Sequence, residues 1–184
     1  MKDYKIKLNS KNENYETAII IPCFNSHKFL SRALNSITKQ SLPFSEVIII
    51  NDGSTDLETL KYLDRIKDNF FIYNQTNKGL AAARNKGVLL SKSKWITFLD
   101  CDDWLEISAN KLFREINHKN NYNESIFYYS DLILAGEKSG IHSSTFNKFE
   151  QHLMNGIPYS IYINRKKFLD CGGYDESFTK GYED

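Results

Sequence analysis

Four short apolar runs recur along the first half of the chain, and the segments between them have the three-to-four-residue spacing of amphipathic helices. The runs are Thr17–Pro22, Glu46–Ile50, Phe70–Tyr73 and Trp95–Leu99. They are rich in β-branched and aromatic residues and too short for helices, so we expect strands buried on both faces. Strands that alternate with helices predict βαβ units and a mainly parallel sheet. The sequence therefore predicts an α/β protein.

The three intervening helices have identifiable N-terminal caps. Ser26 and Asp56 are expected to cap the first two, and Asn77 the third, which runs from Gly79 to Leu90. The residues expected to face the sheet are Phe29, Leu30, Ala33, Leu34 and Ile37 in the first helix and Leu57, Leu60 and Leu63 in the second. These patterns place one helix after each of the first three strands.

After Trp104 the regular alternation ends. The expected elements are a helix at Ser108–His118, a strand at Ile126–Tyr129, a hairpin within Asp131–Ser144, a short helix at Phe146–Asn155, a strand at Pro158–Asn164 and a short helix ending at Cys171–Gly173. A length of 184 residues suits one domain. We expect a polar leader over residues 1–16 and one domain over 17–184, with a regular half at 17–103 and a smaller mixed half at 104–184.

Charge and cysteine content exclude several classes of protein. The formal net charge is +1, so nothing favours nucleic acid as a partner. No apolar run is long enough to span a bilayer, and the N-terminus does not resemble a signal peptide. Cys23, Cys101 and Cys171 are odd in number and far apart. We therefore expect reduced thiols in a cytosolic protein rather than a disulfide framework or a zinc site.

Three carboxylates directly follow the fourth apolar run: Asp100, Asp102 and Asp103. Ligands of open α/β sheets bind beyond the carboxyl ends of the strands, where these side chains would emerge. Hard oxygen ligands suit Mg²⁺ or Mn²⁺. The alternative is structural, because Asp102 or Asp103 can also cap a helix that starts at Trp104. The acidic run alone leaves both interpretations open.

Polar or aromatic residues also follow the first two predicted strands. Phe24–Asn25 follows the first, and Asn51–Ser54 follows the second. If the strands are neighbours, these segments and the acidic run share one edge of the sheet. There Asp52 can accept a hydrogen bond from a base N–H, and Phe24 can pack on its ring. The alternative is that Asp52–Gly53 is only a turn and Phe24 only a core residue.

These segments resemble the family 2 glycosyltransferases with the GT-A fold. The resemblance rests on Ile19–Asn25, Val47–Asp56, Asn77–Asn85, Phe98–Trp104, Gly172–Glu176 and Tyr182–Asp184. It covers almost everything after Glu16, and it implies a Rossmann-like, mainly parallel central sheet flanked by helices. Residues 17–103 would form the nucleotide-sugar-binding half. Residues 104–184 would form the acceptor-side half, expected to be incomplete at its C-terminus because relatives continue past this point.

The resemblance implies roles for residues around the nucleotide of a UDP-sugar donor. Pro22 and Phe24 would shape the base pocket, and Asp52 would contact the uracil edge. Arg84 would support the nucleotide end, and Asp100 would contact the ribose. The alternative for Arg84 is a cation on the surface of its helix. The sequence departs from the family at Asn51, where many relatives carry an acid, so only Asp52 supplies a carboxylate there and its contact with the base is unaffected.

The resemblance also implies a metal-assisted, inverting transfer. Asp102 would hold Mn²⁺ or Mg²⁺ at the diphosphate, and Asp184, beside Glu183, would be the base that takes the acceptor proton. Gly172–Glu176 would lie at the acceptor side, the alternative being a helix C-cap and turn. The acceptor would be a saccharide or a lipid-linked one used in polysaccharide biosynthesis, at the inner face of the membrane with peripheral membrane association. Alternatives are a non-catalytic nucleotide-sugar-binding fragment and a phosphatase based on Asp100 and Asp102.

Overall fold

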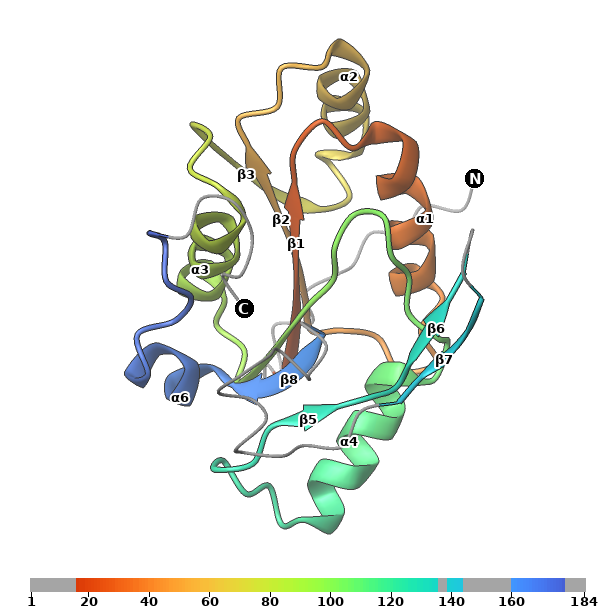
Figure 1. Ribbon diagram of the computed structural model, residues 1–184, viewed down its shortest axis with the longest axis vertical. Helices are drawn as coiled ribbons and strands as arrows, with labels where there is room; N and C mark the ends of the chain where they lie inside the picture. Colours follow the sequence, from red (N-terminus) through yellow and green to blue (C-terminus); the bar gives the residue numbers. More distant parts are fainter. Residues whose placement is uncertain (1–15, 136–138, 144–159, 178–184) are drawn as a thin grey trace.

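The computed structural model describes residues 16–135, 139–143 and 160–177. Its main sheet has six strands in the order β3-β2-β1-β4-β8-β5 (Figure 1). The strands are β3 (Phe71–Gln75), β2 (Glu46–Asp52), β1 (Thr17–Cys23), β4 (Trp95–Phe98), β8 (Ile161–Asn164) and β5 (Tyr128–Tyr129). The first four are parallel to one another, whereas β8 and β5 add to the β4 side in antiparallel pairs. The predicted α/β fold with a mainly parallel sheet is confirmed.

Two layers of helices cover the two faces of this sheet. The helices are α1 (His27–Thr38), α2 (Leu57–Ile66), α3 (Leu80–Leu90), α4 (Ala109–Lys119) and α6 (Arg165–Asp170). One core cluster joins α1, α2 and α4 to Ile19 and Ile49, and the other joins α3 and α6 to Ile20 and Ile50. Because successive strand residues point to opposite faces, the continuous apolar runs feed both cores.

The second half of the chain is mostly irregular, as expected, but its elements are shorter. The predicted hairpin is confirmed as β6 (Leu132–Leu134) paired antiparallel with β7 (Gly140–His142). The strand expected at Pro158–Asn164 is seen from Ile161, and the helix expected at Phe146–Asn155 lies outside the described residues. Within the described ranges, no helix combines the length and apolarity that a membrane span requires.

The helix caps and faces differ in detail from the sequence pattern. Asp56 caps α2 as predicted, accepting a hydrogen bond from the Thr59 N–H at 3.0 Å. That bond and the Thr59 hydroxyl lower the pKa of Asp56 to about 2. Ser26 makes no side-chain cap, and Gly79 rather than Asn77 stands at the N-cap of α3. The cap interpretation of Asp102 or Asp103 is wrong, because no helix starts at Trp104 and α4 begins five residues later.

Three apolar residues expected in the core are exposed instead. Phe29, Leu57 and Leu60 are 51%, 69% and 38% exposed. The buried stripes of α1 and α2 are narrower than the apolar pattern. They consist of Leu30, Ala33, Leu34 and Ile37 in α1 and of Thr59, Leu63 and Ile66 in α2. Phe29 has a different surrounding, described below.

The approach of α3 to the sheet depends on Gly87. A β-carbon at this position would lie 2.3 Å from Cγ2 of the buried Ile20 side chain. We expect Gly87→Ala to lower the free energy of unfolding by about 1–3 kcal/mol, because an added methyl group must push α3 away from β1. Urea denaturation measures this change. Leu89→Ala, on the exposed side of the same helix, is the control and should change stability by less than about 0.5 kcal/mol. Equal stability of the two variants would contradict the close packing.

Candidate functional site

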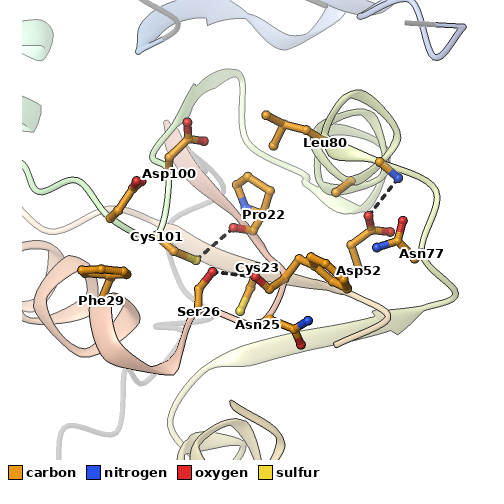
Figure 2. A pocket seen from close by; sticks show the side chains of 14 residues that line it. Pro22, Cys23, Asn25, Ser26, Phe29, Asp52, Asn77, Leu80, Asp100 and Cys101 are labelled. Carbon is orange, nitrogen blue, oxygen red and sulfur yellow. Dashed lines mark hydrogen bonds between the residues drawn. The ribbon is translucent and has the colours of Figure 1, made fainter. Parts of the chain in front are cut away.

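A cavity of about 380 Å³ lies at the carboxyl edge of the parallel strands. Its walls are Pro22, Cys23, Phe24, Asn25, Ser26, Phe29, Asp52, Asn77, Gly79, Leu80, Ala83, Asp100, Cys101 and Asp102. These residues come from the ends of β1, β2 and β4 and from the starts of α1 and α3 (Figure 2). The expectation that three loops meet at one edge is therefore confirmed, because β1 lies between β2 and β4.

The loops after β1 and β2 are tied together by Asn25. Its backbone has φ of 51°, in the left-handed region that asparagine tolerates better than most residues. Its side-chain oxygen accepts hydrogen bonds from the N–H groups of Thr55 and Asp56, both at 2.9 Å. Its own N–H donates to the Ser54 hydroxyl at 3.0 Å. This network holds the neighbouring Phe24 at the cavity, where its ring is 47% exposed.

Asp52 is buried at the end of β2 and organises the start of α3. One carboxylate oxygen accepts from the Gln75 amide at 2.8 Å and from the Lys78 N–H at 2.9 Å. The other accepts from the Gly79 N–H at 2.9 Å (Figure 2). A carboxylate has about four acceptor positions, so the second oxygen retains one for a ligand. Gly53 allows the backbone before α3 to lie close to the end of β2, because a β-carbon at position 53 would be 2.5 Å from the Asn77 nitrogen.

Arg84 is buried rather than on the helix surface, which rules out the alternative considered for it. Its side chain is 1% exposed, and its guanidinium donates to the two carboxylate oxygens of Asp100 at 3.1 and 3.3 Å. The guanidinium also faces the Phe98 and Tyr174 rings, at 6.0 and 5.2 Å from their centroids. Burial raises the pKa of Asp100, and Arg84 opposes this effect. Arg84 does not line the cavity but acts on it through Asp100.

Asp102 lies at the mouth of the cavity with an exposed side chain. Asp103 faces a separate hollow of about 280 Å³ between the loop after β4 and the β6 segment. Among the described residues, no three His, Cys, Asp or Glu side chains converge to hold a metal ion. The carboxylates present can therefore hold Mg²⁺ or Mn²⁺ in one way only: one or two of them bind the ion together with the phosphates of a substrate. Glu183 and Asp184 lie outside the described residues.

The Gly172–Glu176 segment ends α6 as a helix cap. The Gly172 and Gly173 N–H groups donate to the carbonyls of Leu169 and Phe168, both at 3.0 Å. The next residue, Tyr174, is held by the Asn85 side chain of α3. This side chain accepts a hydrogen bond from the Tyr174 N–H and donates one to the Tyr174 carbonyl, both at 2.9 Å. The cap alternative is thus correct for the backbone, and the segment is fixed against the helix that carries Arg84.

Two groups of cavity residues escaped sequence reasoning. Phe29 and Leu80 face the cavity, although Phe29 was expected in the core. Cys23 and Cys101 were assigned no chemistry, yet both line the cavity. The Cys101 thiol donates to the Pro22 carbonyl at 3.0 Å. The neighbouring Cys23 thiol and burial raise the pKa of Cys101, and the neighbouring Cys101 thiol lowers that of Cys23. Helical periodicity contains no signal for these positions, because each depends on contacts between distant segments.

The structure is that of an α/β protein with a cavity at the carboxyl edge of its sheet, the edge where open α/β sheets bind their ligands. Residues 18–172 match the family described as glycosyl transferase family 2, and the chain belongs to this family.

Curated relatives share part of the chain. Glycosyltransferase GlyA of Streptococcus pneumoniae is 37% identical over 90 residues, which cover 48% of this chain and 13% of that protein. The Escherichia coli protein named UDP-Glc:alpha-D-GlcNAc-diphosphoundecaprenol beta-1,3-glucosyltransferase WfgD is 33% identical over 121 residues, 63% of this chain and 46% of that protein. The chain thus spans less than half the length of either relative.

Solved structures confirm the GT-A-type fold. Staphylococcus aureus TarS, residues 1–349, superposes with a TM-score of 0.75 over 91% of this chain and 52% of that chain, at 20% identity. TarS structures in complex with UDP and with UDP-GlcNAc superpose with TM-scores of 0.73 and 0.70. At this identity the likeness concerns the fold alone.

Proposed function

We propose that this chain is the catalytic domain of an inverting glycosyltransferase that transfers a sugar from a UDP-sugar. The observation that carries the proposal is the cavity at the sheet edge, which combines an exposed aromatic ring, a buried acceptor and two further carboxylates. The TarS structures with UDP and UDP-GlcNAc, and the donor in the name of WfgD, support a nucleotide-sugar donor.

In this proposal four residues of the cavity wall hold the nucleotide. Pro22 and Phe24 pack against the base, and Asp52 accepts the base N–H with its remaining acceptor position. Asp100 accepts a ribose hydroxyl. Arg84 is a positioning residue, because its two hydrogen bonds fix the direction of the Asp100 carboxylate.

Asp102 would hold the divalent metal together with the diphosphate of the donor. A bound Mn²⁺ or Mg²⁺ stabilises the charge that develops on the leaving diphosphate. The exposed position of Asp102 at the cavity mouth supports this assignment, because its carboxylate is accessible to a ligand. Asp100 is less suited to the metal, since Arg84 already engages both of its oxygens.

Asp184, with Glu183 beside it, is the proposed base that removes the proton of the acceptor hydroxyl as its oxygen attacks the anomeric carbon. The acceptor is proposed to be a saccharide or a lipid-linked saccharide at the cytoplasmic face of the membrane, in polysaccharide biosynthesis. Residues 17–103 would bind the donor and residues 104–184 the acceptor.

The family match disfavours the phosphatase alternative, as does the ion pair that engages both oxygens of Asp100.

Calorimetric titration with UDP, with and without Mn²⁺, tests the nucleotide and metal assignments together. We expect Mn²⁺-dependent binding of UDP in preference to GDP, weakened tenfold or more by Asp102→Ala because a metal ligand is lost. Asp64→Ala removes an exposed carboxylate of α2 and should leave the affinity unchanged. Binding of neither nucleotide by folded protein would overturn the site. Binding that does not depend on Mn²⁺ or Asp102 would overturn the metal assignment alone.

A further inference from the structure

Two thiols from different segments face the same cavity. Cys23 ends β1 and is 1% exposed, and Cys101 follows β4 and is 6% exposed. Both belong to the core cluster on the α1 face, and both line the cavity beside Asp102. The cavity gives small reagents access to these otherwise buried groups. Figure 2 shows the two side chains on adjacent segments of the wall.

The parallel pairing of β1 with β4 ends close to these two residues. The last pair of the parallel β1–β4 ladder is Ile20 with Phe98, and the next N–H, that of Leu99, donates to the Ile20 carbonyl at 3.0 Å. Cys23 and Cys101 each lie three residues beyond this pair. Neighbouring strands are about 4.8 Å apart, and a disulfide spans roughly 4.4–6.8 Å between α-carbons. Cys23 is the last residue of β1, and Cys101 stands in the turn after β4. The Cys101 thiol lies 3.0 Å from the Pro22 carbonyl oxygen, and Pro22 is directly bonded to Cys23.

We propose that Cys23 and Cys101 are a reversible dithiol–disulfide pair in the wall of the cavity. The oxidant is a small disulfide. One protein thiolate attacks it, forming a mixed disulfide and releasing one small thiol. The second protein thiolate displaces the other small thiol and forms the Cys23–Cys101 bond. The two protein thiols lose two electrons and two protons, and the oxidant gains both as two free thiols.

The bond would alter the loop that carries the carboxylates. In the reduced protein the Cys101 thiol donates to the Pro22 carbonyl, and a disulfide sulfur has no hydrogen to donate. Cys101 stands between Asp100 and Asp102, and Arg84 holds Asp100 from the other side. Drawing Cys101 toward Cys23 therefore displaces the carboxylates relative to each other. This consequence for ligand binding rests on the proposed function, whereas formation of the bond does not.

Oxidation of the Cys171→Ser variant tests the Cys23–Cys101 disulfide directly. The substitution removes the exposed third cysteine, which could otherwise react. Folded protein is incubated with hydroxyethyl disulfide, alkylated and analysed by intact mass and peptide mapping. We expect the loss of two hydrogen masses, a linked Cys23–Cys101 peptide and reversal by dithiothreitol. The bond should form at least tenfold faster in folded protein than in urea, because the fold holds the two thiols together. A bond that forms no faster in folded protein, or adducts at single cysteines only, would overturn the proposal.

Matched single-thiol variants complete the test. Cys23→Ser and Cys101→Ser, each in the Cys171→Ser background, should gain an adduct of the reagent but never lose two hydrogen masses. In calorimetry, oxidised protein should bind UDP with Mn²⁺ at least tenfold more weakly than reduced protein. Equal affinities in the presence of the bond would overturn the displacement of the carboxylates. If the reduced protein binds no UDP, the proposed function fails. The mass measurement still shows whether the Cys23–Cys101 disulfide forms.

Discussion

Replacing Arg84 by methionine is expected to lower the free energy of unfolding by about 3 kcal/mol at neutral pH. Methionine fills much of the same volume but leaves the half-buried Asp100 carboxylate without the guanidinium that now faces it. Burial already raises the pKa of Asp100, and the variant removes the charge that opposes this effect. Because a raised pKa costs stability only while the group is ionised, the loss should be smaller in mild acid. Urea denaturation at neutral and acid pH measures both effects.

A double variant separates the ion pair from simple loss of packing. Arg84→Met combined with Asp100→Leu removes both charges, and an apolar pair of similar volume is often as stable as a buried ion pair. We expect the double variant to recover most of the stability that Arg84→Met loses. A single variant within about 1 kcal/mol of the wild type, or a double variant less stable than the single one, would contradict the role assigned to this pair.

Replacing Asp52 by alanine should also be costly, by about 3 kcal/mol, because three donors lose their acceptor. They are the Gln75 amide and the N–H groups of Lys78 and Gly79. Each buried donor left unsatisfied costs roughly 1–3 kcal/mol. The start of α3 should loosen as well, which hydrogen exchange of the Lys78 and Gly79 amides measures.

Asp52→Asn is the matched control for this prediction. It retains one acceptor oxygen, for Gln75 and Lys78, and places an NH₂ group against the Gly79 N–H. We expect it to lose less stability than Asp52→Ala, with faster exchange at Gly79 than at Lys78. Unchanged exchange at both amides in Asp52→Ala would show that the loop before α3 is held by other contacts.

Local patterns identified the parts of the site that follow strands. The apolar runs predicted β1, β2 and β4, and the chemistry at their ends predicted Phe24, Asp52, Asp100 and Asp102 at one edge of the sheet. Parallel strands bring their carboxyl ends together wherever they are neighbours, so the prediction needed only the strand order. The role of each residue in binding remains a prediction for the titrations proposed above.

The sequence by itself determined the α/β class, the sheet edge that carries the site and the cap at Asp56, because these depend on short-range periodicity and turn chemistry. Only the tertiary structure decided that Arg84 is buried against Asp100, that Phe29 lines the cavity and that Cys23 and Cys101 share the same cavity wall. Each of these contacts joins segments far apart in the chain, and packing between layers selects them. Helical spacing describes one element at a time, so it carries no information about which distant element covers a side chain.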